Sequence, residues 1–173
     1  MLVIRAAEVD DAAAIATVHV DTWRAAYAGL IPQSYLDSLT VQNRSTGWVR
    51  LLERGEVGGF TLVSEGHDRR VVGFASAGPS RSHRRYFQGE ISQLYVLPAF
   101  QQGRHGRRLF LAAANHLAEM GHTGLIVWVL ADNPARQFYE KLGGVKVAET
   151  QRPFAGVLLR EIAYGWEDTP RYG

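Results

Sequence analysis

The stretch that decides the fold covers residues 95–110 and reads YVLPAFQQGRHGRRLF. An apolar run ends at a proline, a loop rich in glycine and arginine follows, and the pattern then becomes helical. Backbone N–H groups at such a loop and helix N-terminus are free to donate hydrogen bonds, and the helix dipole adds positive potential. Because both features attract phosphate oxygens, the stretch predicts a site for a phosphorylated ligand.

Length and composition are typical of one folded domain. The chain has 173 residues, of which 46% are hydrophobic and 21% are charged, so we expect a single domain over residues 1–173. No apolar run reaches the roughly 18 residues of a membrane span, and the N-terminus lacks the layout of a signal peptide. Cysteine is absent, which excludes disulfides and protein thiolate chemistry. We therefore expect a cytoplasmic protein without membrane contact, either a monomer or a homodimer.

The charges nearly balance but are unevenly placed. The formal net charge is +2 and no nucleic-acid module is recognisable, so no nucleic-acid partner is expected. Histidine and acidic residues show no metal-ligand spacing, and no metal is expected. The arginines gather in two short clusters, which suits a small polyanion better than a long phosphate backbone, although the first is equally read as solvated surface. The clusters are Arg81, Arg84 and Arg85, and Arg104, Arg107 and Arg108.

Hydrophobic periodicity divides the chain into strands and helices. The first helix is expected to be capped by Asp10 or Asp11. The continuous apolar run at residues 125–130 predicts a strand covered on both faces. The element order predicts an α/β chain (mixed α+β) whose mixed sheet carries helices on both sides. We expect strands at 2–5, 60–65, 71–77, 89–97, 125–130, 146–150 and 157–164, and helices from 10 or 11, at 32–36, 43–54, 104–120 and 133–143.

Two segments together resemble the acyl-CoA-binding core of the GCN5-related N-acetyltransferase (GNAT) superfamily. Residues 101–106, QQGRHG, are similar to the family signature of Gln or Arg, two variable residues, Gly, one variable residue, and Gly or Ala. Residues 133–143, NPARQFYEKLG, resemble the family's Asn…Ala-x-x-Phe-Tyr-x-x-x-Gly helix. The loop alone is a weak signal, whereas both segments in this order, each after a strand, form a specific one.

The resemblance implies the single-domain GNAT fold. This fold has a central mixed, mostly antiparallel, twisted sheet of about seven strands, with helices on both faces and with strands 4 and 5 splayed apart. The acyl-CoA-binding core then covers residues 86–143. The N-terminal helices, at about residues 10–54, form the acceptor side.

The same resemblance implies acetyl-CoA as the cofactor. Backbone amides of residues 101–107 are expected to face its pyrophosphate, and the backbone of the splayed strand to bond its pantetheine arm. Asn133 is expected both to cap the following helix and to contact the cofactor, since its side chain has a donor and an acceptor end. The expected cofactor-binding residues are Leu94, Tyr95, Val96, Gln101, Gln102, Gly103, Arg104, His105, Gly106, Arg107, Asn133, Ala135 and Tyr139.

One position of the loop departs from the family pattern. Arg104 stands where the family usually has glycine, while a glycine precedes it at Gly103. A side chain makes a positive φ costly, by about 1 kcal/mol or more. We therefore expect either a negative φ at Arg104 or a positive φ at Gly103, with the Arg104 side chain adding a direct charge to the pyrophosphate.

The resemblance implies Tyr139 as the catalytic acid, because it stands at the tyrosine of the family's helix motif, although it is alternatively read as a half-buried helix tyrosine. Acetyl transfer from a thioester to an amine expels a thiolate, and a phenol can protonate that leaving group as it forms. The amine must also lose a proton, and Glu90, on the strand before the loop, is the expected base, acting directly or through water. Glu90 is equally read as a surface glutamate at a strand end.

The acceptor pocket is expected at the first helices, where the family builds it. This implies Trp23, Tyr27 and Glu90 as substrate contacts, although aromatic residues at this spacing are more often part of a core. Leu30, Tyr35, Arg84 and Arg85 are further candidates.

The sequence thus predicts an acetyl-CoA-dependent N-acetyltransferase. It would transfer the acetyl group directly to a primary amine of a small molecule or peptide in a ternary complex, because no cysteine can carry a protein thioester. The alternative is a catalytically silent GNAT-like module that binds or senses acyl-CoA, which the departure at Arg104 permits.

Overall fold

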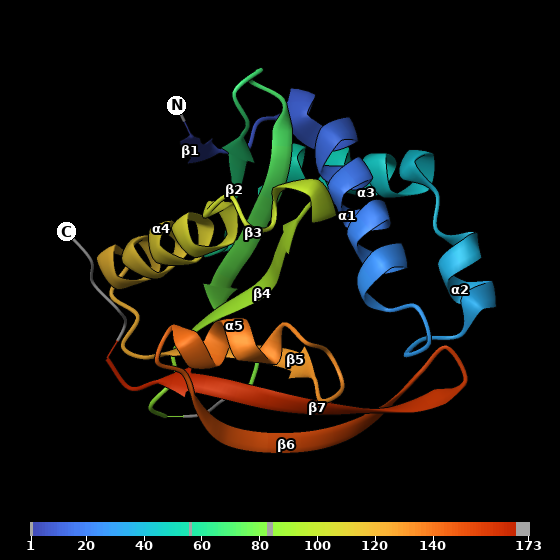
Figure 1. Cartoon of the computed structure of the whole chain (residues 1–173). Helices are drawn as coiled ribbons and strands as arrows, with labels where there is room; N and C mark the ends of the chain where they lie inside the picture. The colour runs from blue at the N-terminus through green and yellow to red at the C-terminus, as the bar shows by residue number, and fades with distance from the viewer. Residues whose placement is uncertain (1, 56, 83–84, 169–173) are drawn as a thin grey trace.

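The computed structural model describes residues 2–55, 57–82 and 85–168, which form one sheet with helices packed against it (Figure 1). Helices dominate the first third of the chain and strands the remainder. In chain order the elements are β1 (Val3–Ala6), α1 (Ala12–Ala26), α2 (Gln33–Ser38), α3 (Val41–Arg54), β2 (Phe60–Glu65), β3 (Val71–Pro79), β4 (Gly89–Val96), α4 (His105–Glu119), β5 (Leu125–Leu130), α5 (Arg136–Lys141), β6 (Val145–Phe154) and β7 (Val157–Trp166).

The sheet has the strand order β1-β2-β3-β4-β5-β7-β6. Within the described residues, β4 and β5 pair in parallel and all other neighbouring strands pair antiparallel. A parallel pair requires a crossover connection, and α4 supplies it. The expected mixed, mostly antiparallel sheet of seven strands is confirmed.

Strands β4 and β5 separate soon after they meet. Their parallel pairing includes only Gly89 with Leu125 and Glu90 with Ile126. Beyond Glu90, β4 continues to pair with β3 on its other side, with a register shift that leaves Ser92 bulged. We call the opening between residues 91–96 and 127–130 the fork. The predicted splaying of strands 4 and 5 is confirmed.

Helices cover both faces of the sheet, as expected. Neighbouring residues on a strand point to opposite faces, and Phe74 and Ala75 of β3 belong to different buried clusters. Phe74 packs with Trp48 of α3, the ring centroids lying 5.1 Å apart, and with the buried side of α1. Ala75 packs in the cluster that contains Leu109 of α4. The fork therefore lies between a layer of helices on one face of the sheet and a layer on the other.

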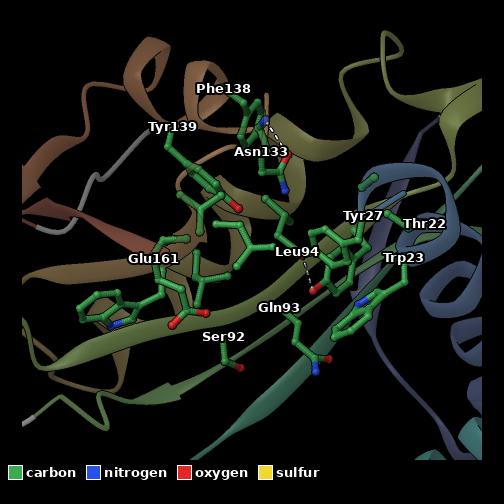
Figure 2. A pocket seen from close by; sticks show the side chains of 18 of the residues that line it. Thr22, Trp23, Tyr27, Ser92, Gln93, Leu94, Asn133, Phe138, Tyr139 and Glu161 are labelled. Atoms are coloured by element: carbon green, nitrogen blue, oxygen red, sulfur yellow. Dashed lines mark hydrogen bonds between the residues drawn. The ribbon is translucent and has the colours of Figure 1, made fainter. Parts of the chain in front are cut away.

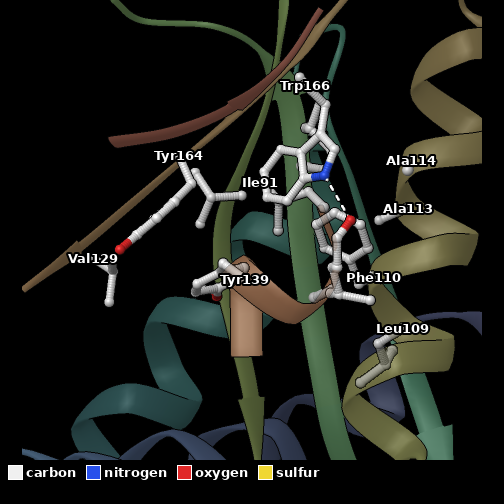
Figure 3. Close-up of a cluster of buried hydrophobic side chains, with 14 of the residues drawn as sticks. Ile91, Leu109, Phe110, Ala113, Ala114, Val129, Tyr139, Tyr164 and Trp166 are labelled. Carbon is white, nitrogen blue, oxygen red and sulfur yellow. Dashed lines mark hydrogen bonds between the residues drawn. The ribbon is translucent and has the colours of Figure 1, made fainter. Parts of the chain in front are cut away.

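Contacts with Trp166 hold the short helix α5 beside the fork (Figure 3). Trp166 of β7 packs on Phe110 of α4, with ring centroids 5.0 Å apart, and its Nε1 donates a hydrogen bond of 2.9 Å to the carbonyl of Leu142. Gly144 lies against the same indole, so closely that a Cβ there would meet a Trp166 carbon at 2.7 Å. These contacts determine where Tyr139 of α5 lies.

Some expected boundaries and caps were wrong. Asp11 does not cap α1 with its side chain, because its carboxylate accepts hydrogen bonds from Arg5 and from the backbone N–H of Glu8. Helix α3 begins earlier than expected, since Thr40 Oγ1 caps it through the N–H of Asn43. Strand β6 extends to Phe154, because its pairing with β7 continues to the end of their hairpin.

Candidate functional site

The fork opens into a cavity of about 1000 Å³. Residues 90–96 of β4 form one wall and residues 127–130 of β5 the other. The start of α4, at Gly106, and helix α5 border the cavity, and so do Trp23 of α1 and Tyr27, which follows that helix (Figure 2). One continuous space therefore connects the predicted phosphate loop with the predicted acceptor helices.

The phosphate loop is held in place by its own hydrogen bonds. Gln101 Nε2 donates to the carbonyl of Val96 over 3.1 Å, and the N–H of Gly103 donates to the carbonyl of Phe100 over 3.0 Å. Helix α4 then begins at His105. Its first turn supplies N–H groups without intrahelical partners, which is the arrangement that binds anions.

Arg104 takes the unusual backbone angle itself, with φ 65° and ψ 2° in the left-handed region. Both alternatives predicted above, a negative φ at Arg104 or a positive φ at Gly103, were therefore wrong. Gly103 serves a different purpose: a Cβ there would meet His105 Cδ2 at 2.9 Å and the Phe100 carbonyl at 3.2 Å. The glycine thus permits close packing of the loop, and the strain is at its neighbour.

Replacing Arg104 by glycine is expected to stabilise the fold. Glycine removes a left-handed strain of about 1–2 kcal/mol and costs part of that in chain entropy, so the free energy of unfolding should rise by about 0.5–1 kcal/mol. Arg107→Gly, inside the exposed first turn of α4, is the control and should lose up to about 1 kcal/mol. Urea unfolding of both variants measures the difference, and a loss of stability in both would contradict the strain at position 104.

The expected cofactor residues divide into two groups. Leu94, Tyr95, Val96, Gln101, Gly106, Asn133, Ala135 and Tyr139 line the cavity. Gln102, Gly103, Arg104, His105 and Arg107 are not among its described lining residues. His105 in particular is buried, and its Nδ1 lies 2.7 Å from Ser64 Oγ, so its ring faces the sheet and only its backbone N–H is directed along the helix start.

The end of the cavity next to α5 is bordered by Gly106 and Asn133. A Cβ at Gly106 would make only ordinary contacts, at 3.6 Å from Phe138 and 3.8 Å from Val96. Asn133 Oδ1 accepts a hydrogen bond of 2.9 Å from the N–H of Ala135, in the turn that precedes α5. The N-cap residue of α5 is Ala135 and no side chain caps the helix, so the expectation that Asn133 caps it was wrong. The amide nitrogen of Asn133 is directed toward the cavity (Figure 2).

Tyr139 reaches the cavity from a buried position on α5. Its residue is 6% exposed, and its ring lies among those of Phe110, Phe138 and Trp166. Burial raises the pKa of this phenol well above its usual range, because the charged phenolate loses hydration there. The hydroxyl therefore stays protonated at neutral pH and is able to donate a proton.

Aromatic side chains form the acceptor end. Trp23 and Tyr27 pack edge to face with ring centroids 4.8 Å apart, and the Tyr27 hydroxyl lies 3.4 Å from that of Tyr95. Both Trp23 and Tyr27 line the cavity, as expected, whereas Leu30 and Tyr35 pack behind them in the core. Of the two further arginine candidates, Arg85 is exposed and Arg84 lies outside the described residues.

Glu90 lies at the closed end of the fork and is not on the surface. It is 2% exposed, and Arg81 holds both of its carboxylate oxygens: the backbone N–H donates to Oε2 over 3.0 Å and Nη2 donates to Oε1 over 2.8 Å. A buried carboxylate needs such a partner. The pair positions the carboxylate beside the cavity and balances its charge.

Several lining residues were missed by the sequence reasoning. Glu161 of β7 borders the cavity and pairs with Arg152, whose Nε lies 2.9 Å from Glu161 Oε2. Ser92 and Gln93 of β4 border it as well. Residues 89–97 were expected to form a strand, in which Gln93 points to one face. Only the position of the helices shows that this face meets a cavity.

Within residues 2–55, 57–82 and 85–168, no group of three His, Asp or Glu side chains is arranged to hold a metal ion, and no helix is long and apolar enough to cross a membrane.

The chain is similar to a family model over part of its length and to a curated relative over nearly all of it. Residues 79–153 match the family model described as FR47-like protein. The uncharacterized N-acetyltransferase YuaI of Bacillus subtilis is 36% identical over 168 residues, which cover 97% of this chain and 94% of that protein.

Solved structures share the fold at lower identity. The structure of yncA from Salmonella typhimurium with its cofactor acetyl-CoA has a TM-score of 0.70 and 23% identity, covering 100% of this chain and 96% of that one. The paia N-acetyltransferase of Thermoplasma acidophilum in complex with coenzyme A has a TM-score of 0.67 and 17% identity, covering 94% and 98%. The forked sheet agrees with these folds, and the relationship to YuaI shows that the chain belongs to the GCN5-related N-acetyltransferase superfamily.

Proposed function

We propose that the protein transfers an acetyl group from acetyl-CoA to a primary amine of a small molecule or peptide while both are bound. The observation that carries this proposal is the single cavity of the fork, which extends from Gly106 at the start of α4 to Trp23 and Tyr27 and has Tyr139 on its wall. Membership of an N-acetyltransferase superfamily and the CoA and acetyl-CoA bound in two structures of the same fold support the choice of donor.

The residues suit binding of the donor across the fork. Backbone N–H groups at the start of α4 would hold the pyrophosphate, helped by the helix dipole. The backbone of residues 94–96, which has no β5 partner because the strands diverge, would hydrogen-bond the pantetheine arm. Asn133 would add a donor from the opposite side.

The reaction requires the transfer of two protons. The amine nitrogen attacks the thioester carbonyl carbon, a backbone N–H near Val96 polarises its oxygen, and the carbon–sulfur bond breaks. Tyr139 donates its hydroxyl proton to the departing sulfur. The proton that the amine loses goes to Glu90, directly or through water, and Arg81 holds that carboxylate in place.

Glu90→Gln is expected to lower kcat/KM by about 100-fold at pH 7, within the range of general acid–base catalysis. The amide still accepts a hydrogen bond from Arg81 but takes no proton. The loss should shrink as the pH rises, because more of the amine is then already deprotonated. Measured pH–rate profiles of the two forms test this.

Glu161→Gln is the matched comparison, since Glu161 is the other carboxylate on the cavity wall and is also paired with an arginine. We expect its effect on kcat/KM to stay within about threefold. A larger loss in Glu161→Gln than in Glu90→Gln would assign the base to β7 instead of β4.

Direct transfer in a ternary complex is tested by initial-rate kinetics. With acetyl-CoA and amine varied together, double-reciprocal lines should intersect. Parallel lines would indicate an acetylated protein intermediate and would contradict direct attack.

A further inference from the structure

A second cavity, of about 380 Å³, adjoins the acceptor end of the first. Helix α3 forms one side of it, through Asn43, Arg44 and Trp48, and His19 of α1 contributes to it as well. Arg81, Ser92 and Gln93 line both cavities. The two cavities therefore share a border at these residues, across which a small molecule bound in the second cavity would extend to reach the fork.

Buried polar groups beside this opening lack partners. Among the described residues, both ring nitrogens of His19, Thr22 Oγ1 and Gln93 Oε1 are buried without a hydrogen bond. His19 is only 4% exposed, and its ring lies among those of Trp23, Trp48, Phe74 and Tyr95. Buried groups of this kind are normally satisfied by protein, ordered water or ligand. These groups are therefore available to hydrogen-bond a polar ligand.

His19 and Gln93 offer specific hydrogen bonds to that ligand. Burial, followed by the charge of Arg44, lowers the pKa of His19 to about 4, so the imidazole is neutral at pH 7 and has one donor and one acceptor nitrogen. Gln93 Oε1 is an acceptor where the cavities meet. It is placed to receive an N–H from a molecule that extends toward the fork.

The charge of the second cavity is positive. Arg44 lies with its guanidinium 6.0 Å from the centre of the Trp23 ring and donates to the Tyr35 hydroxyl over 3.5 Å, and no described carboxylate pairs with it. The other arginine of the cavity, Arg81, is paired with Glu90. No Asp or Glu occurs among the described lining residues. An anionic group is therefore favoured beside Arg44.

We propose that the acceptor is a compact amino acid or similar amine that carries a carboxylate, with the carboxylate bound by Arg44 in the second cavity and the amine directed past Gln93 into the fork. This rests on the acetyl-transfer function proposed above and assigns its substrate class. A polyamine or other polycation is disfavoured, because the carboxylates bordering the first cavity, Glu90 and Glu161, are both paired with arginines.

The test compares amines that differ only at the carboxylate. Free amino acids, their carboxamides and the corresponding decarboxylated amines are offered to the wild-type protein with acetyl-CoA. We expect kcat/KM for the best free amino acid to exceed that of its carboxamide and of its decarboxylated form by at least about tenfold. Equal or better use of the decarboxylated amine overturns the proposal.

Arg44→Ala gives the second readout. KM for the amino acid should rise by about 10- to 100-fold, with KM for acetyl-CoA unchanged and with the carboxamide little affected, and Arg44→Lys should recover part of the loss. Arg50→Ala, on an exposed position of the same helix, is the control and should behave like wild type. An equal loss for amino acid and carboxamide in Arg44→Ala overturns the proposal.

The possible outcomes distinguish failure of the proposed substrate class from failure of the proposed acetyl transfer. Turnover of amines without any preference for a carboxylate rejects the substrate class and leaves acetyl transfer intact. Absence of thiol release with every amine in the panel rejects both.

Discussion

Tyr139→Phe is expected to lower kcat by about 100- to 1000-fold, the range that general acid catalysis supplies. The substitution removes one oxygen and leaves the ring among Phe110, Phe138 and Trp166. Without the hydroxyl, the departing thiolate must take its proton from water. Binding of acetyl-CoA, measured by calorimetry, should stay within about threefold of wild type.

Tyr164→Phe is the matched control for this variant. Tyr164 is buried in the same cluster, with its ring centroid 6.3 Å from that of Tyr139, but its hydroxyl donates to Glu140 Oε1 over 2.6 Å and is not on the cavity wall. Its removal should cost about 1–2 kcal/mol of stability and change kcat little. Equal losses of kcat in both variants would mean that the cluster, and not the Tyr139 hydroxyl, matters for turnover.

The raised pKa of Tyr139 predicts how kcat depends on pH if Tyr139 is the catalytic acid. Burial raises it above the usual range of a phenol, so the acid form persists as the pH rises. Deprotonation of Tyr139 should therefore cause no fall in kcat near pH 10. A basic limb at pH 9–10 that disappears in Tyr139→Phe would contradict the buried, protonated phenol.

Gly106→Ala is expected to raise KM for acetyl-CoA by at least about tenfold, while the fold keeps its stability or gains up to about 1 kcal/mol. The new methyl group meets Phe138 only at ordinary contact distance, and alanine favours the helix. The same methyl occupies the place where the pyrophosphate would approach the N–H groups of α4, and loss of one charge-assisted hydrogen bond is worth about 1.5–3 kcal/mol.

Gly103→Ala provides the opposite pattern in the same loop. Its methyl would lie 2.9 Å from His105 and 3.2 Å from a backbone carbonyl, so we expect lower thermal stability together with weaker binding. Steady-state kinetics and thermal unfolding of the two variants separate loss of the ligand's space from damage to the loop. If Gly106→Ala bound acetyl-CoA as wild type does, the pyrophosphate could not lie at the start of α4.

The sequence predicted those parts of the fold that depend on local patterns. The apolar run at residues 125–130 coincides with β5, because a strand buried on both faces needs no alternation. The family motifs then located the fork, which periodicity alone does not show.

The parts that failed depend on contacts between distant segments. Local preference suggested a negative φ at Arg104 or a positive φ at Gly103, yet Arg104 has the positive φ and Gly103 lies close to His105 and the Phe100 carbonyl. Arg44 joins the acceptor end only because α3 packs beside α1. Glu161 joins it because β7 pairs with β5 across the sheet. No sequence pattern within α3 or β7 alone indicates that these segments contribute residues to the cavities.

Transfer of an acetyl group from acetyl-CoA to an amine in this cavity can be measured without any variant. The most direct test incubates the purified protein with acetyl-CoA and the panel of amino acids, carboxamides and decarboxylated amines, and measures free CoA thiol and N-acetyl product in the same samples by mass spectrometry. We expect equal amounts of both, formed only with an amine present and strongly reduced in Tyr139→Phe. Binding of acetyl-CoA, seen as a rise in melting temperature, without thiol or product from any amine would contradict it and would leave a silent acyl-CoA-binding module.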